Sequence, residues 1–415
     1  MKKINIINKK IDIKNIKIII FFIYLLFVYI FGSDTATVKY SEIILMLFLG
    51  LELINILKTK KIKYAVPIVL IFLFAFYCFL SNFWAINPEI SINKSKTLFI
   101  LATFLLMTYN FFIDIDKGEE VLLKIIMWAG VIFSIYVISY YGIGEYFNKL
   151  MSGERVGAEI NNVNAIGLQT SIAFIIAFFY GLYDNKKGYF LLSIIPFIIS
   201  LGTGSRKVIV AIVLGVVLMF LLKREKKTNI IQLGKKIIIF IIIISVFIYI
   251  AQLPMFASIF ERFEKMMNSV TGQGKVDNST KTRILFTEIG IEQFLETPIL
   301  GIGIGNSGDL TANVIGRSTY LHNNFVELLA TTGIIGFILY YSVFLYIIIN
   351  CIQLLRLKNK YINIVLIIFL INLLLDYGVV SYYTKNTYVY ILLGIITVQN
   401  ARKERSNEQE NKKMS

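Results

Sequence analysis

Long apolar runs recur from one end of the 415-residue chain to the other, and this pattern limits the fold more than any other feature. A helix that crosses a bilayer needs about 20 predominantly apolar residues. Hydrophobic residues make up 57% of the sequence and charged residues only 16%, which is outside the usual range of a soluble domain. The sequence therefore predicts an all-α integral membrane protein, a polytopic bundle of transmembrane helices.

We expect about twelve transmembrane helices, with ten or eleven as the alternative because several runs are short or contain polar residues. The expected spans lie near residues 18–31, 41–57, 64–82, 97–113, 121–141, 165–183, 188–201, 207–222, 237–253, 324–350, 361–376 and 387–400. No small-residue cleavage site follows the first run, so we interpret it as a retained signal-anchor helix.

Positive charge sets the expected orientation. The net charge is +16, and the lysines gather in alternate connections between the spans, including both terminal segments. Because basic residues accumulate in cytoplasmic loops, both termini are expected in the cytoplasm of a multi-pass protein. Membrane lipids are then the natural partners of this charge, and nucleic acid is not expected because the sequence shows no soluble basic domain.

The chain divides into four expected parts. These are N-terminal transmembrane helices (1–153), a core (154–350) with a large outer loop (254–321), C-terminal transmembrane helices (351–400) and a disordered cytoplasmic tail (401–415). Residues 282–296 of the loop have helical periodicity and are expected to form an interfacial helix. The glycines of GIGIGN (301–306) lack a flanking βαβ unit, so we interpret them as a flexible connector and close-packing turn rather than a dinucleotide site.

The single histidine of the chain, His322, lies at the end of the outer loop and directly before Asn323 and an apolar run. An imidazole accepts a proton near neutral pH, and the start of a helix favours its neutral form. His322 is therefore a candidate general base, and the alternative is an interfacial histidine hydrogen-bonded to a loop carbonyl. One histidine without a nearby thiol predicts no metal site, and Cys78 and Cys351 are expected to be packing residues.

Two further stretches contain candidate binding residues. In LGTGSRKVIV (201–210), a Gly-Ser turn places Arg206 at an expected helix start, an arrangement that binds anions. The alternative is a plain helix cap with Arg206 on a lipid phosphate. The loop GERVGAEINNVNAIGL (153–168) supplies Arg155 and Asn164, which either hydrogen-bond sugar hydroxyls or form an ordinary loop and helix start.

Arg283 lies on the apolar side of the expected loop helix, opposite a stripe that contains Glu288 and Glu292. Charge is normally kept on the wet side of an interfacial helix, so this position is unusual. The arginine either snorkels towards lipid headgroups or meets an anionic partner at the interface.

Taken in order, four features resemble the O-antigen ligase and polymerase superfamily of bacterial envelope glycosyltransferases. They are Arg155 with its asparagine-rich loop, the TGSRK turn, the arginine-led helix followed by TPILGIGIGN, and HNNFVELLATTGIIG. The resemblance covers residues 155–336, and the first 150 residues match only in hydropathy and number of spans. It implies a metal-independent, inverting enzyme without a cofactor that uses a polyprenyl-diphosphate-linked glycan as donor, on the outer side of the bacterial cytoplasmic membrane.

The resemblance also implies roles for individual residues. Arg206 and Arg283 match the arginines that hold the donor diphosphate, and His322 matches the residue that activates the acceptor hydroxyl. Arg317 competes with Arg283 for the second arginine role. Asn323 is a further candidate for substrate contact, together with the two residues of the 153–168 loop.

Two reactions of this superfamily share the same chemistry. A ligase transfers the finished glycan to lipid A–core or another surface acceptor, whereas a polymerase joins repeat units on the carrier. We narrowly favour the ligase type. A lipid-linked sugar transporter or flippase would show internal repeats or buried charges at mid-membrane, and a peptidoglycan glycosyltransferase would need a key outer carboxylate; the sequence shows neither pattern.

Overall fold

The computed structural model describes residues 12–32, 36–223, 278–357 and 359–414, together with four single residues between 224 and 277. Within these ranges every regular element is a helix, which agrees with the predicted all-α class. The helices are α1 (Ile13–Phe31), α2 (Val38–Thr59), α3 (Val66–Leu80), the short 3-10 helix η1 (Ser81–Phe83), α4 (Pro88–Phe112), α5 (Gly118–Tyr141), α6 (Ile143–Met151), α7 (Val163–Asp184), α8 (Lys187–Gly202), α9 (Arg206–Leu222), α12 (Asn278–Glu296), α13 (Ser307–Ile315), α14 (Asn324–Leu354), α15 (Lys360–Asp376) and α16 (Lys385–Met414).

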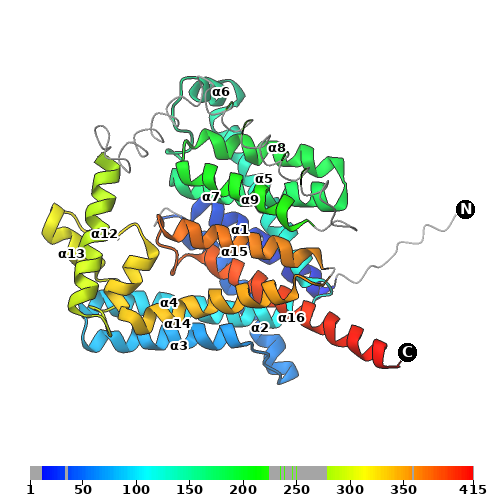
Figure 1. Ribbon diagram of the computed structural model, residues 1–415, viewed down its shortest axis with the longest axis horizontal. Helices are drawn as coiled ribbons and strands as arrows, with labels where there is room; N and C mark the ends of the chain where they lie inside the picture. Colours follow the sequence, from blue (N-terminus) through cyan, green and yellow to red (C-terminus); the bar gives the residue numbers. More distant parts are fainter. Residues whose placement is uncertain are drawn as a thin grey trace, which may run out of the picture.

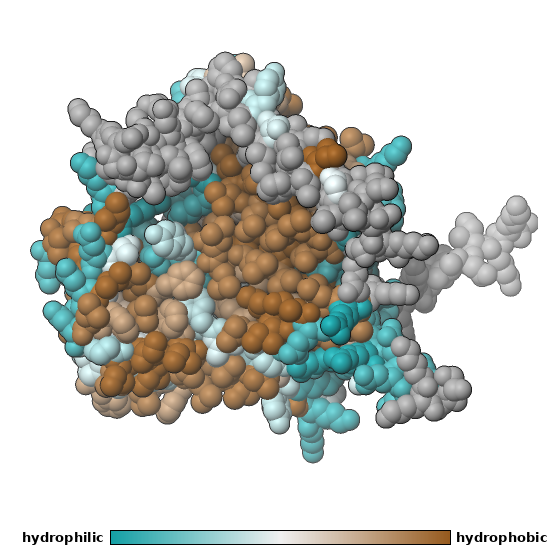
Figure 2. Space-filling view, in the orientation of Figure 1, coloured by the Kyte–Doolittle hydropathy of each residue, from teal (hydrophilic) through white to brown (hydrophobic). Residues whose placement is uncertain are grey.

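Most of these helices pack side by side in one bundle (Figure 1). Helix α7 packs against α5, α8 and α9, while α14 packs against α3, α15 and α16. One continuous hydrophobic core runs through the bundle and includes residues of α1 as well as of α16. Figure 2 shows hydrophobic residues over the middle of the visible face and hydrophilic residues towards its two ends, as a membrane-embedded bundle requires.

A helix lies at eleven of the twelve expected spans, and the span near 237–253 falls outside the described residues. Among the described residues, seven helices are long and apolar enough to cross a membrane: α1, α2, α3 with η1, α4, α5, α7 and α14. Helices α8, α9 and α15 have only 16, 17 and 17 residues. A helix of that length rises roughly 25 Å, against about 30 Å of hydrocarbon, so the count of twelve is not confirmed.

Asparagine side chains begin four of the helices. Asn87, Asn162, Asn323 and Asn359 are the N-cap residues of α4, α7, α14 and α15, and each accepts a hydrogen bond from a backbone N–H of the first turn. These N–H groups have no partner inside the helix, so the cap stabilises the helix end and fixes its position. The cap at Asn323 fixes the start of α14 directly beside the single histidine.

The expected outer loop (254–321) is described only from Asn278 onward, and residues 254–277 lie outside the described residues. In the described part, α12 runs crosswise to the bundle helices at one end of the molecule, with α13 beside it (Figure 1). Its exposed side carries Glu288 and Glu292. That α12 is an interfacial helix, and that this end lies on the outer side, stay predictions.

The C-terminal segment differs from the disordered tail expected for residues 401–415, because α16 continues through almost all of it. Contacts of Arg402 and Glu404 hold the extension, and Arg402 also donates to Asn350. The guanidinium of Arg402 lies over the ring of Tyr346 and donates to its hydroxyl at 3.0 Å, and Asn359 donates to Glu404 at 3.0 Å. The segment is also rich in Lys, Glu, Arg and Gln, which favour helix even where the side chains are exposed.

Candidate functional site

Helix α12 is held against the start of α14 by an apolar contact. Phe286 of α12 lies against Leu321 and Val326, and all three side chains are buried. Gly290 permits the close approach, since a Cβ at this position would lie 2.3 Å from Cγ1 of Val326. The contact brings Arg283, which lies about one helical turn before Phe286, to the loop that precedes α14.

The GIGIGN segment (301–306) is packed into the bundle and is not a flexible connector. The N–H of Ile302 donates to the carbonyl of Ala330 at 3.2 Å, and the carbonyl of Ile302 accepts from Ile86 at 3.1 Å. All three glycines of the segment have positive φ, which glycine adopts at little cost. The expectation of a close-packing turn is therefore confirmed, and that of flexibility is wrong.

His322 lies in the loop between α13 and α14. Its backbone adopts the left-handed conformation, with φ of 58°, which is uncommon for a residue other than glycine. The imidazole stacks on Phe286 with 5.9 Å between ring centroids and 4° between ring planes, and it contacts Tyr320 at 4.2 Å between centroids. Among the described residues, no hydrogen bond joins a ring nitrogen of His322 to a carbonyl, and the role of this histidine stays a prediction.

Burial and positive charge keep this imidazole neutral. Partial burial, first, and then the charges of Arg283, Lys207 and Arg317 lower the pKa of His322 from 6.5 to about 4. Each of these effects disfavours the imidazolium form. At neutral pH the ring therefore has a nitrogen that can accept a proton.

The turn between α8 and α9 is braced by polar contacts. Ser205 is the N-cap residue of α9, but its hydroxyl donates to Asn164 Oδ1 at 2.9 Å instead of capping the helix. Arg155 Nε donates to the carbonyl of Thr203 at 2.9 Å. Arg155 and Asn164 thus support the turn that presents Arg206, half-buried, at the first position of α9. Their contact with sugar hydroxyls stays a prediction.

Lys207 is a cation of this region that the sequence analysis did not single out. Its Nζ donates to the carbonyl of Gly378 in the turn between α15 and α16. A Cβ at Gly378 would lie 2.7 Å from Cε of Lys207, so the two segments are in close contact. The charges of Arg283 and Arg206 both act on Lys207. Two consecutive cations in the turn sequence SRK are the signal that could have identified it.

The structure therefore brings most of the expected site residues to one end of the bundle. Arg283 and Arg317 act electrostatically on His322, and Arg206 is linked to them through Lys207. These cations come from α9, α12 and the loop after α13. Their arrangement around a neutral imidazole is suited to an anionic ligand that reacts next to a base.

Two buried carboxylates near His322 were also missed. Glu327, in the first turn of α14, accepts hydrogen bonds from Ser307 Oγ at 2.5 Å and from the N–H of Leu321 at 2.9 Å. Asp376 ends α15 and accepts from Asn324 at 3.3 Å. A carboxylate inside an apolar run is the signal that could have identified both. Within the described residues, no group of three His, Cys, Asp or Glu side chains could hold a metal ion.

Asp376 ties the start of α14 to the turn between α15 and α16. Its second oxygen accepts from Ser381 Oγ at 2.6 Å, and Tyr341 donates to the first at 2.9 Å. Asn324 in turn accepts from the N–H of Ser381 at 2.8 Å. The turn that contacts Lys207 and the helix that follows His322 are therefore fixed to each other.

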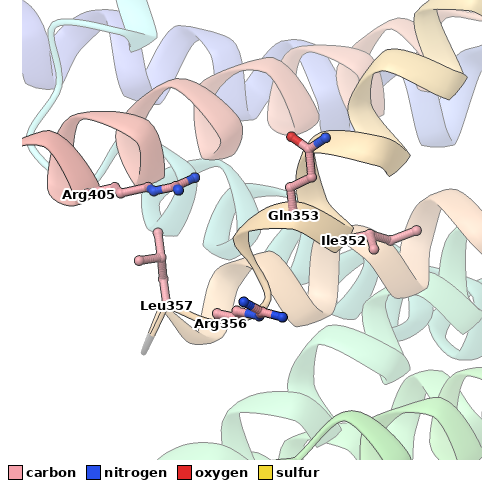
Figure 3. A pocket seen from close by; sticks show the side chains of 5 residues that line it. All are labelled: Ile352, Gln353, Arg356, Leu357 and Arg405. Carbon is pink, nitrogen blue, oxygen red and sulfur yellow. The ribbon is translucent and has the colours of Figure 1, made fainter.

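A cavity of about 540 Å³ lies at the opposite end of α14 and is not part of this site. Figure 3 shows its lining side chains, which come from the last turn of α14, the turn that follows it and the extension of α16. They are Ile352, Gln353, Arg356, Leu357 and Arg405.

The apolar helical bundle is that of a membrane protein. A cluster of cations and one neutral imidazole form a polar site at one end of this bundle. A family model described as O-antigen ligase matches residues 191–341 of this chain. The match confirms the resemblance to the O-antigen ligase and polymerase superfamily, and it spans Arg206, Arg283, Arg317 and His322. It supports a glycosyltransferase-like enzyme of the bacterial inner membrane that uses lipid-linked glycan and polysaccharide substrates. No curated protein matches the sequence.

Proposed function

We propose that this protein transfers a glycan from polyprenyl diphosphate to an acceptor sugar on the outer side of the cytoplasmic membrane, in a ligase-type reaction. The observation that carries the proposal is the neutral His322 beside the cations of α9 and α12. A base and an anion-binding group at one end of a membrane bundle are what transfer from a lipid diphosphate requires. The family match over residues 191–341 supports the same reaction class.

The reaction follows from the charges. His322 takes the proton of the acceptor hydroxyl, whose oxygen attacks the anomeric carbon of the donor sugar. The bond from that carbon to the diphosphate oxygen breaks, and the electron pair leaves with the diphosphate. Arg206 and Arg283 bind the diphosphate and stabilise the negative charge that it gains. In-line attack inverts the configuration of the anomeric carbon. Guanidinium groups, rather than a metal ion, stabilise the negative charge of the leaving group.

The test is replacement of the chromosomal gene by a His322→Ala variant in the native host. Gels of surface glycan and of the lipid-linked pool then report both substrate and product. We expect surface glycan to be lost and long glycan to accumulate on polyprenyl diphosphate. Accumulation of single repeat units on the carrier would indicate a polymerase instead, and normal surface glycan would contradict the role of His322.

Glu288→Ala is the matched control, because Glu288 lies on the exposed side of α12. This variant should keep a wild-type glycan pattern. Immunoblots of membrane fractions must show equal amounts of both variants, so that loss of glycan in the His322 variant reports chemistry rather than folding.

A further inference from the structure

The carboxylate of Glu327 joins three segments that meet at His322. The side chain is only 2% exposed. One carboxylate oxygen accepts from the hydroxyl of Ser307, the first residue of α13, at 2.5 Å. The other accepts from the N–H of Leu321 at 2.9 Å. Since Leu321 directly precedes His322, the carboxylate of α14 holds the backbone from which the imidazole extends.

The backbone of His322 needs such a hold. A residue with a Cβ persists in the left-handed conformation only where its surroundings fix it, and His322 has φ of 58°. On one side, Leu321 is bonded to the Glu327 carboxylate. On the other side, the Asn323 carbonyl accepts from the Glu327 N–H at 2.9 Å. Glu327 therefore binds both neighbours of His322, one through its side chain and one through its backbone.

We propose that Glu327 is a positioning residue that fixes the His322 imidazole between Phe286 and Tyr320, and that it acts through hydrogen bonds rather than through its charge. The charged groups that act on His322 are cations of other segments: Arg283 of α12, Lys207 of α9 and Arg317 of the loop. The carboxylate instead contacts a backbone N–H and a hydroxyl, two groups that a neutral acceptor of the same shape also satisfies. The consequence for catalysis rests on the proposed function, whereas the positioning itself does not.

Three substitutions separate hydrogen bonding from charge. In Glu327→Gln, the amide oxygen accepts from Leu321 and the amide N–H₂ donates to the Ser307 oxygen, so both contacts persist without the charge. Glu327→Ala removes both contacts and leaves a buried N–H without a partner. Ser307→Ala removes one contact. Glu52→Ala is the control, because Glu52 is a buried carboxylate that pairs with Lys17 between α1 and α2.

The chain has one histidine, so histidine labelled with ¹³C and ¹⁵N gives a single imidazole signal in the full-length protein in lipid nanodiscs. Stacking on Phe286 and Tyr320 shifts the ring protons, and this shift reports the position of the ring. We expect the wild-type shift in Glu327→Gln and Glu52→Ala, loss of most of it in Glu327→Ala, and an intermediate value in Ser307→Ala. The proposal is overturned if Glu327→Gln moves the signal as far as Glu327→Ala, or if Glu327→Ala leaves it in place.

If Glu327→Ala does not yield folded protein, the comparison of Glu327→Gln with Ser307→Ala decides the question. A retained signal in the first and a displaced signal in the second support the proposal, and the reverse overturns it. Transfer assays add a second readout. A misplacement of about 1 Å at a reacting group can lower the rate by about 10²-fold. We expect a loss of up to this size in kcat, with little change in KM and recovery in Glu327→Gln.

The two hypotheses fail in different ways. If His322→Ala keeps transferring glycan, the proposed function of His322 is wrong, while the imidazole signal still tests the role of Glu327. If the signal is unchanged in Glu327→Ala but His322→Ala is inactive, the function stands and the positioning role is wrong.

Discussion

His322 is surrounded by cations, and this sets the pH range in which it can act as a base. Burial and the charges of Arg283, Lys207 and Arg317 lower its pKa to about 4, below the ordinary 6.5. A base must be unprotonated in the free enzyme, so kcat/KM should fall only as the pH approaches about 4. A transfer assay from pH 4 to pH 8 with detergent-solubilised protein checks this.

A fall of kcat/KM that begins at or above pH 6.5 would contradict a base whose pKa is lowered by burial and neighbouring cations. Stability gives an independent check, because the unfolded chain binds the proton more strongly than the folded protein does. This contribution of His322 is present above pH 6.5 and is lost as the pH falls from about 6.5 to 4. In His322→Gln, which does not titrate in this range, the corresponding part of the pH dependence of the apparent Tm should disappear.

Arg206 and Arg283 should tolerate lysine poorly. A guanidinium presents several donors in a planar fork that matches two phosphate oxygens, whereas an ammonium is a point charge. Loss of one charge-stabilising donor typically lowers kcat by about 10²–10³-fold. We expect that range for either arginine-to-alanine variant, and at least about a 10-fold loss for either arginine-to-lysine variant, in the same transfer assay.

Lysine variants with wild-type rates at both positions would show that charge alone suffices. Arg317→Lys tests the competing assignment of the second arginine. If Arg317→Lys loses activity while Arg283→Lys keeps normal activity, the second arginine that binds the diphosphate is Arg317. Arg317 is exposed, and Arg283 is half-buried beside the Phe286 contact. The greater burial of Arg283 therefore favours Arg283 as the second arginine that binds the diphosphate.

At the scale of elements, the path of α14 depends on Gly333, which lies about two and a half turns after the start of the helix. Gly333 has φ of 60° and ψ of −168°, a conformation that essentially only glycine adopts. A Cβ there would lie 2.2 Å from the carbonyl oxygen of Ile299. Gly333→Ala should therefore displace the segment that leads from α12 to α13 and lower the apparent Tm in detergent by several degrees.

Gly50→Ala is the control for this prediction. Gly50 lies within α2, and a Cβ there would contact nothing within 4 Å. Because alanine favours helix over glycine by about 1 kcal/mol, this variant should match or slightly exceed the wild-type apparent Tm. Equal behaviour of the two variants would mean that α14 tolerates a regular helix at Gly333.

The elements could be predicted from the sequence because hydrophobicity and caps are local signals. Apolar runs located a helix at nearly every expected span, and Asn323 marks the start of α14. A carboxylate in an apolar run and the second cation of SRK mark Glu327 and Lys207 in the sequence, but these signals do not reveal what the two side chains contact. Their importance depends on Leu321, Ser307 and Gly378, contacts that only packing creates. The left-handed backbone of His322 is likewise a tertiary effect.

At the scale of the whole molecule, α15 and α16 are not among the described helices that are long and apolar enough to cross a membrane. Between Asn313 of α13 and Glu408 of α16 lie α14, α15 and the apolar part of α16. If all three cross the membrane, the two residues lie on opposite sides. With 17 residues, α15 rises roughly 25 Å, slightly less than the hydrocarbon thickness of about 30 Å. If either α15 or α16 does not cross, both residues lie on the same side.

Single cysteines at these two exposed positions decide the matter, because the native Cys78 and Cys351 are fully buried and should not react. Intact spheroplasts are treated with a membrane-impermeant maleimide. We expect Asn313→Cys to react, and Glu408→Cys to react only after permeabilisation.

This result would place the end that contains His322 outside, where lipid-linked donor is available after export. Reaction of both in intact cells would mean that α15 or α16 does not cross the membrane. Reaction of Glu408→Cys alone would invert the topology, which the lysine-rich connections argue against.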